Sequence, residues 1–159
     1  MGRMSGRRGE YLVAMQFLLV ALFVVVPSGS VVVPDVLAGW WLVRSIVLAV
    51  FLVVAAIFGL AGLWQIRHSL TPLPYPVDHN RLETGGIYSL VRHPLYSSQL
   101  FATFGWTLYT AGLWSGLITV LLFLLFDYKA AREEQWLIER HAEYAGYARQ
   151  VRKFIPWLY

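Results

Sequence analysis

The feature that most constrains this chain is the run from Trp40 to Trp64, which contains a single charged side chain, Arg44. As a helix rising about 1.5 Å per residue it would reach roughly 36 Å, enough to cross a hydrocarbon core of about 30 Å with some tilt. Tryptophan at both ends suits the two membrane interfaces, and Arg44 lies close enough to one end to extend its guanidinium into the interface. We therefore expect a membrane-spanning helix here.

The composition agrees with a small integral membrane protein. Charged residues make up 14% of the 159 residues and hydrophobic residues 58%, whereas a soluble domain has about 25% charged residues. The chain has no cysteine, which excludes disulfides, a thiolate nucleophile and cysteine-ligated metal. Its four histidines show no spacing of four residues, so we expect no histidine-based metal site.

Three more apolar segments, at 11–26, 95–111 and 114–128, are also expected to be membrane helices. From 129 to 151 aromatic and aliphatic residues recur at steps of three and four between charged residues, which predicts an amphipathic helix on the membrane surface. The expected fold is an all-α integral membrane protein with about four transmembrane helices and a C-terminal amphipathic interfacial helix. We divide it into a disordered basic tail (1–10), N-terminal transmembrane helices (11–64) and a catalytic half (65–159) of one membrane domain.

The basic residues predict an orientation. Twelve of the thirteen lysines and arginines lie in the N-terminal tail, the 65–93 loop and the C-terminal segment, and the two loops on the other side have none. The positive-inside rule therefore places both termini and the 65–93 loop in the cytoplasm, in a cell membrane such as the inner membrane of a bacterium. Membrane topology and anionic lipid explain the basic excess, so we expect no nucleic-acid partner.

A cleaved signal peptide is the alternative interpretation of the N-terminus. A basic start, an apolar run and Ser28-Gly29-Ser30 fit one. We rank it second because the apolar run is long and no Ala-x-Ala follows it.

The polar motif Arg92-His93-Pro94-Leu95-Tyr96 lies where the polar loop enters the third apolar segment. Ionisable groups at this depth are costly, which makes them a functional hypothesis. The other interpretation is an interfacial arginine, a helix-starting proline and an aromatic belt. A helix that begins at Pro94 leaves first-turn N–H groups beside Arg92 and His93, where an anionic end of a small molecule can bind.

Several motifs in the C-terminal half together resemble the isoprenylcysteine carboxyl methyltransferase family and related membrane methyltransferases that act on phospholipid amines and on thiols. These motifs are the run Leu82–Tyr88, the segment Val91–Tyr96, Glu133-Glu134, the tail tyrosines Tyr144 and Tyr147, and Phe154-Ile155-Pro156. The resemblance covers about the C-terminal half, in order and in spacing.

This resemblance implies a site for S-adenosylmethionine at the cytoplasmic interface, with a lipophilic acceptor that enters from the bilayer. Carried over by position, the cofactor contacts are Asn80, Arg81, Leu82, Glu83, Tyr88, His93, Pro94, Leu95, Tyr96 and Glu133. The chemistry agrees, because Arg92 and His93 suit the methionine carboxylate, Glu133 suits the ribose hydroxyls or the amino group, and an aromatic face suits the sulfonium. Glu134 points about 100° away from Glu133 around a helix, so we expect it to matter much less.

The acceptor-binding position departs from the family pattern. The arginine that contacts the substrate one turn before the glutamates is Lys129 here, with Arg132 as a second candidate, and lysine cannot make the bidentate contact of arginine. Carboxylate, thiol and amine acceptors therefore all stay open. Methyl transfer to such groups needs alignment more than proton transfer, so Arg92, Lys129 and Arg132 are expected to orient the acceptor.

Two other functions also stay open. The helix arrangement resembles the catalytic half of membrane sterol reductases, which use NADPH, and a non-catalytic membrane subunit would use the polar loop as a partner surface. The sequence leaves open the oligomeric state and the identity of the acceptor.

Overall fold

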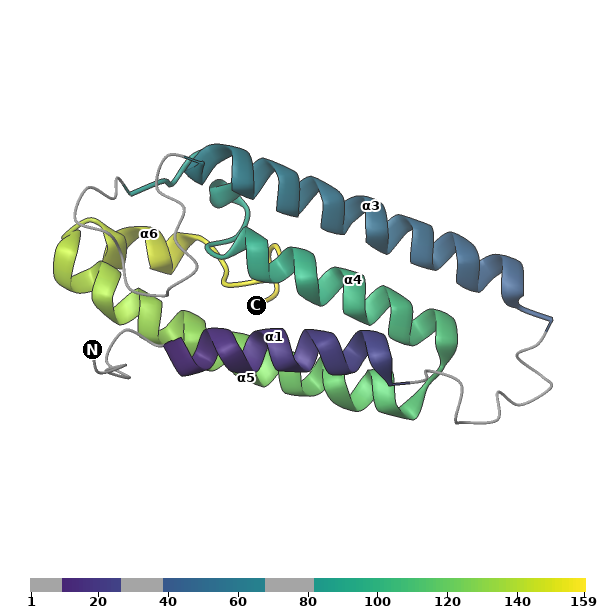
Figure 1. Ribbon diagram of the computed structural model, residues 1–159. Coiled ribbons are helices and arrows are strands. Elements are labelled where there is room, and N and C mark those ends of the chain that lie inside the picture. Colours follow the sequence, from purple (N-terminus) through teal and green to yellow (C-terminus); the bar gives the residue numbers. More distant parts are fainter. Residues whose placement is uncertain (1–9, 27–38, 68–81) are drawn as a thin grey trace.

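The computed structural model describes residues 10–26, 39–67 and 82–159, and in these ranges it contains helices and no strand. The elements are α1 (Glu10–Val25), α3 (Trp41–Ile66), the short 3-10 helix η2 (Gly86–Ser89), α4 (Pro94–Thr110), α5 (Leu113–Arg140) and α6 (Tyr144–Gln150). Four long helices lie alongside one another, and α6 lies at the end where α3 and α5 finish and where α1 and α4 begin (Figure 1).

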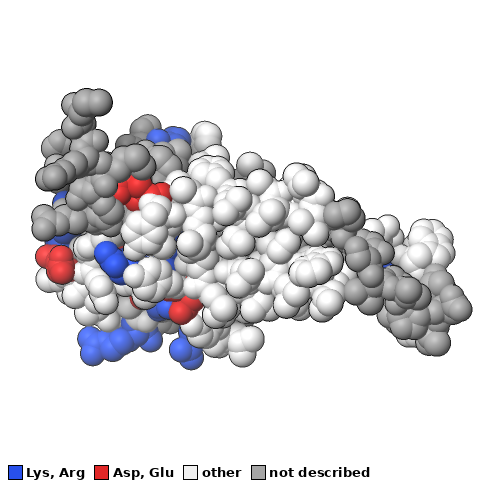
Figure 2. Space-filling model, turned by 60° about the horizontal axis from the view of Figure 1, so that its bottom comes forward, with Lys and Arg blue, Asp and Glu red and all other residues white. Residues whose placement is uncertain are grey.

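The expected all-helical fold is confirmed for the described residues, and two of its helices are candidate membrane spans. Among the described residues, α3 and α5 are long and apolar enough to span a bilayer, whereas α1 has 16 residues and α4 has 17. Figure 2 shows the charged side chains gathered toward one end, while the middle of the same face is almost free of them. This distribution fits a protein with one polar end outside the hydrocarbon, and a total of four crossings stays a prediction.

The expected break at Tyr128 and the single surface helix from 129 to 151 are wrong. Helix α5 continues without interruption from Leu113 to Arg140, and a separate short helix starts at Tyr144. No glycine or proline occurs between residues 117 and 140, so nothing in the backbone ends the helix where the composition changes. The charged residues of α5 begin at Asp127, where we expect the helix to approach the edge of the apolar layer. A helix can pass through that edge without a break in its backbone hydrogen bonds.

The C-terminal tail returns to the start of α4. The backbone N–H groups of Arg92 and His93 donate to the carbonyls of Arg152 and Lys153 at 2.8 and 3.1 Å. The Ser97 hydroxyl donates to the Phe154 carbonyl at 2.7 Å. Since Phe154 is fully buried in the core between α4 and α5, the tail is fixed over the polar motif.

A tight turn positions the motif from the other side. Gly86 has a φ of +54°, and a side chain there would meet the Gln65 amide oxygen at 2.7 Å. The Gln65 amide accepts from the Ile87 N–H and donates to the Gly85 carbonyl, both at 3.0 Å. The two glycines therefore serve the turn that ties the end of α3 to the motif.

Helices α3 and α4 pack closely at Gly59, which yields a test of the fold. The Ser98 hydroxyl donates to the Ala55 carbonyl at 2.7 Å. A Cβ at Gly59 would lie 2.7 Å from the hydroxyl oxygen of Ser98. We expect Gly59→Ala to lower the free energy of unfolding by about 1–3 kcal/mol through overpacking, and the added change Ser98→Ala to restore most of it. Thermal unfolding in detergent measures both, and equal melting temperatures for wild type and Gly59→Ala would contradict the packing.

Candidate functional site

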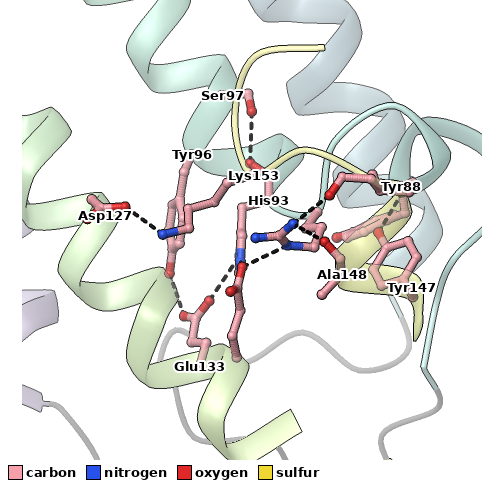
Figure 3. A network of polar contacts seen from close by, with 12 residues as sticks. Tyr88, His93, Tyr96, Ser97, Asp127, Glu133, Tyr147, Ala148 and Lys153 are labelled. Atoms are coloured by element: carbon pink, nitrogen blue, oxygen red, sulfur yellow. Dashed lines mark hydrogen bonds and ion pairs between the residues drawn. The ribbon is translucent and has the colours of Figure 1, made fainter. Parts of the chain in front are cut away.

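A buried histidine joins two adjacent carboxylates at the polar end of the bundle. His93 is 8% exposed, and its Nδ1 and Nε2 lie 3.3 and 3.0 Å from Glu133 Oε2 and Glu134 Oε1. The Tyr96 hydroxyl donates to the other oxygen of Glu133 at 2.5 Å (Figure 3). Together with Arg92, these four residues form what we call the histidine–glutamate cluster.

Arg92 connects this cluster to the C-terminal segment. Its Nε donates to Glu134 Oε1 at 2.9 Å, and its Nη1 donates to the carbonyls of Ala148 and Val151. The guanidinium thus holds α5 and the end of α6 together, and charge-assisted hydrogen bonds of this kind are the stronger ones in proteins.

The cluster lies at a depth set by α5. Glu133 is 20 residues beyond the start of that helix, which at about 1.5 Å per residue is roughly 30 Å, the thickness of the hydrocarbon core. For a helix that starts at the opposite membrane boundary, this length would place the carboxylates near the boundary between hydrocarbon and headgroups, where a site could receive a polar ligand from one side and a lipophilic one from the other.

The electrostatics of His93 follow from its two neighbours. Burial by itself would lower its pKa, but hydrogen bonds and charge interactions with Glu133 and Glu134 outweigh burial and raise the pKa above its ordinary value of 6.5. The two carboxylates thus stabilise the imidazolium form of His93 relative to a free histidine.

Aromatic side chains surround the cluster. Tyr96 stacks on Phe126 with ring centroids 4.9 Å apart and on His93 with centroids 5.5 Å apart. The Tyr147 hydroxyl donates to the Tyr88 carbonyl at 2.5 Å, which closes the space between η2 and α6 (Figure 3). Such rings exclude water and provide faces for a cation.

Among the aromatic residues around the cluster, Tyr144 has a buried hydroxyl without a hydrogen-bond partner in the described part of the chain. Its side chain is 2% exposed. Burial and the charge of Glu134 raise its pKa, while the positive charge of Arg92 acts in the opposite direction. An unsatisfied buried hydroxyl beside the cluster is costly unless a ligand completes it.

The structure brings some of the predicted site residues together and separates others. Those that meet in the cluster are Arg92, His93, Tyr96 and Glu133. Pro94 and Leu95 instead face α3, where their side chains lie beside Gly62. Leu82 and Glu83 lie just before η2, with the charge of Glu83 acting on Tyr88, whereas Asn80 and Arg81 lie outside the described residues.

The two candidate cations on α5 differ in position. Arg132 contacts Tyr128 and Trp136 along its own helix, and none of its described contacts is with the cluster. Lys129 is buried, and its Nζ lies 5.0 Å from the centroid of the Tyr96 ring. Lys129 is therefore the cation of α5 that adjoins the cluster.

Sequence reasoning missed two contributions to the site. Glu134 was expected to point away from the site, yet both glutamates contact His93. The imidazole ring lies between the two side chains, so that one ring nitrogen faces each carboxylate. Gln16 of α1 contacts Lys129, and its signal was a lone amide within the apolar segment 11–26. In the described ranges no group of three or more histidine or acidic side chains has the arrangement of a metal site.

The raised pKa of His93 predicts how stability depends on pH. A histidine whose pKa is higher in the folded protein contributes its full stabilisation below the ordinary value of 6.5, and that contribution is lost as the pH rises through the folded value. Between pH 6 and 9, wild type should therefore lose more thermal stability in detergent than His93→Gln. Parallel pH profiles for the two proteins would show that His93 does not bridge the carboxylates as a cation.

Comparison with known proteins gives this geometry a family. Residues 43–143 match the phospholipid methyltransferase family, and this range contains the whole cluster. Over 81 residues the chain is 36% identical to the cobalt-zinc-cadmium resistance protein CzcN of Cupriavidus metallidurans, a match that covers 50% of this chain and only 38% of that protein. No solved structure matches the chain. With nearly two thirds of its length matched, and with the resemblance seen in the sequence thereby confirmed, the chain belongs to the phospholipid methyltransferase family.

Proposed function

We propose that this protein is a membrane methyltransferase that uses S-adenosylmethionine, bound at the histidine–glutamate cluster, to methylate a lipophilic acceptor. The observation that carries the proposal is the Tyr144 hydroxyl, which is buried within range of the charges of Arg92 and Glu134 and has no hydrogen-bond partner among the described residues. A polar ligand in the cluster would supply the missing hydrogen bond. Family membership makes a methyl donor the natural choice of ligand.

The residues present fit the charges of this cofactor. Glu133 and Glu134 can accept hydrogen bonds from an ammonium group or from ribose hydroxyls, and Arg92 and His93 can donate to a carboxylate. The faces of Tyr96 are occupied by His93 and Phe126, whereas Tyr88 is only partly buried and could offer an aromatic face to a sulfonium. Because the cluster is satisfied internally by its own ion pairs, we expect ligand binding to exchange some of these contacts.

When bound, S-adenosylmethionine supplies a methyl group activated by a positive sulfur. The residues of this chain then have to bind, align and exclude water. The cluster holds the polar end, the tail from Val151 to Phe154 covers it, and α4 and α5 hold the acceptor in line. No general base is required when the acceptor is already an anion or a free amine.

The change Tyr144→Phe tests the site. Removing an unsatisfied buried hydroxyl should leave the stability of the empty protein unchanged or raise it, whereas binding of S-adenosylmethionine should weaken by about 2- to 13-fold, the worth of one hydrogen bond of about 0.5–1.5 kcal/mol. Calorimetry and thermal unfolding in detergent measure the two effects. A loss of stability with unchanged affinity would mean that the hydroxyl serves the fold alone.

The carboxylates give a second measurement. Glu133→Ala and Glu134→Ala should each weaken binding by roughly 10- to 150-fold, because a charge-assisted hydrogen bond is worth about 1.5–3 kcal/mol. The matched control is Glu143→Ala, since the side chain of Glu143 is exposed. If wild type fails to bind S-adenosylmethionine at millimolar concentration, the proposal is wrong, and tight binding of NADPH instead would support the reductase interpretation.

Identification of the product completes the test. Purified protein incubated with labelled methyl donor and a lipid extract should yield a labelled lipid, and mass spectrometry should show whether the methyl group is on oxygen, sulfur or nitrogen. A protein that binds the donor and labels no lipid would not be the enzyme proposed.

A further inference from the structure

A chain of polar side chains crosses from α1 to α5 on the membrane side of the cluster. Lys129 Nζ donates to Gln16 Oε1 at 2.8 Å, and Gln16 Nε2 donates to Gln99 Oε1 at 3.0 Å. Gln99 in turn donates to the Leu95 carbonyl at 3.3 Å. Three helices thus converge on one buried ammonium group.

The charge of Lys129 has no matching anion in direct contact among the described residues. Its side chain is 4% exposed, and it contacts a neutral amide and the Tyr96 ring. Glu133, one turn further along α5, directs its oxygens to Tyr96 and His93 instead. An ammonium group in apolar surroundings costs several kcal/mol unless an anion pairs with it.

The position of Lys129 places it within the hydrocarbon layer. It lies 16 residues beyond the start of α5, or roughly 24 Å along a helix rising about 1.5 Å per residue, and so one turn deeper than Glu133. The ring of Tyr96 contacts Lys129, and its hydroxyl contacts Glu133. A group held by Lys129 would therefore be adjacent to the cluster. Lys129 itself is buried, and a molecule dissolved in lipid would have to reach it past Gln16, whose side chain is only partly buried.

We propose that Lys129 and Gln16 bind the anionic head of the methyl acceptor, so that the acceptor is a lipophilic carboxylate or thiolate and not an amine. This rests on the function proposed above and selects among the acceptors that it leaves open. An amine gains positive charge as it is methylated, which the neighbouring ammonium group opposes. An anion loses its charge in the same step and needs no base.

The transfer then balances without a further reactant. A lone pair of the anionic oxygen or sulfur forms the new bond to the methyl carbon while the bond between methyl and sulfonium sulfur breaks. The electron pair of the broken bond stays on that sulfur, which becomes a neutral thioether. Acceptor and donor each lose one charge, and no proton moves.

Gln16 acts in this site as a positioning residue. It lies on α1, outside the range that matches the family, and it holds Lys129 through one end of its amide and Gln99 through the other. In this proposal α1 helps to select the acceptor, although it lies outside the residues that match the family.

Binding of simple amphiphiles, measured without any methyl donor, tests the proposal. In nanodiscs of zwitterionic lipid, wild type should bind palmitate at least tenfold tighter than hexadecanol or hexadecylamine, which share its chain length. Gln16→Glu places a carboxylate against the ammonium group and should remove this preference, as should Lys129→Met. The matched control is Gln135→Glu, which adds the same charge at an exposed position of α5 and should keep the preference.

The outcomes separate the two proposals. Affinity for S-adenosylmethionine should stay within twofold in Gln16→Glu, which also shows that this variant is folded, and Lys129→Met should be at least as heat-stable as wild type because it removes a buried charge. If wild type binds hexadecanol or hexadecylamine as tightly as palmitate, or if Gln16→Glu keeps the preference, the acceptor site is overturned even when the cofactor binds. If palmitate is preferred and S-adenosylmethionine does not bind, the anion site stands and the methyltransferase proposal fails.

Discussion

The polar end of this protein depends on the contact of one imidazole with two carboxylates. Glu133 and Glu134 are neighbours on α5 and would repel each other in an environment of low dielectric constant. His93 lies between them with one ring nitrogen facing each carboxylate, and the two carboxylates raise its pKa, which stabilises the charged form that can donate from both nitrogens. Since Arg92 binds Glu134 and the tail together, the same contact fixes the start of α4, the end of α5 and the C-terminal segment.

Tyr96 relates this polar cluster to the membrane side of the bundle. Its hydroxyl donates to Glu133, its ring adjoins the ammonium group of Lys129, and its other neighbours include the buried ring of Phe126. In the proposed function, this one side chain would separate the water-soluble cofactor from the lipid-soluble acceptor, and it contacts the groups that would hold each. Alignment of two substrates across so short a distance is the main requirement of a direct transfer.

The sequence predicted the presence of the helices, and the place of the Arg92–Tyr96 motif at the start of α4, better than it predicted where the helices end. Long apolar runs and the Arg92–Tyr96 motif carry strong local signals, because hydrocarbon thickness and the cost of buried charge restrict what such residues can do. The end of α5 was misplaced because a change from apolar to charged residues marks the membrane surface and leaves the backbone hydrogen bonds intact. Glu134 and Gln16 were missed for another reason: their roles depend on which distant side chain occupies the space between two helix faces, which no spacing along the chain encodes.

The lysine at position 129 has a consequence for selectivity that follows from its shape. An arginine binds a carboxylate through two parallel hydrogen bonds and thus selects a planar head, whereas an ammonium group acts as a point charge with no preferred plane. Gln16 and the Tyr96 ring fix the position of the Lys129 ammonium group, but they do not add a second hydrogen-bond donor parallel to it. If the proposed acceptor site is correct, it would select the charge of the acceptor head and its depth in the bilayer. It would accept a carboxylate oxygen or a thiolate sulfur equally well in geometry, so the remaining selectivity would have to come from the apolar walls of α1 and α4.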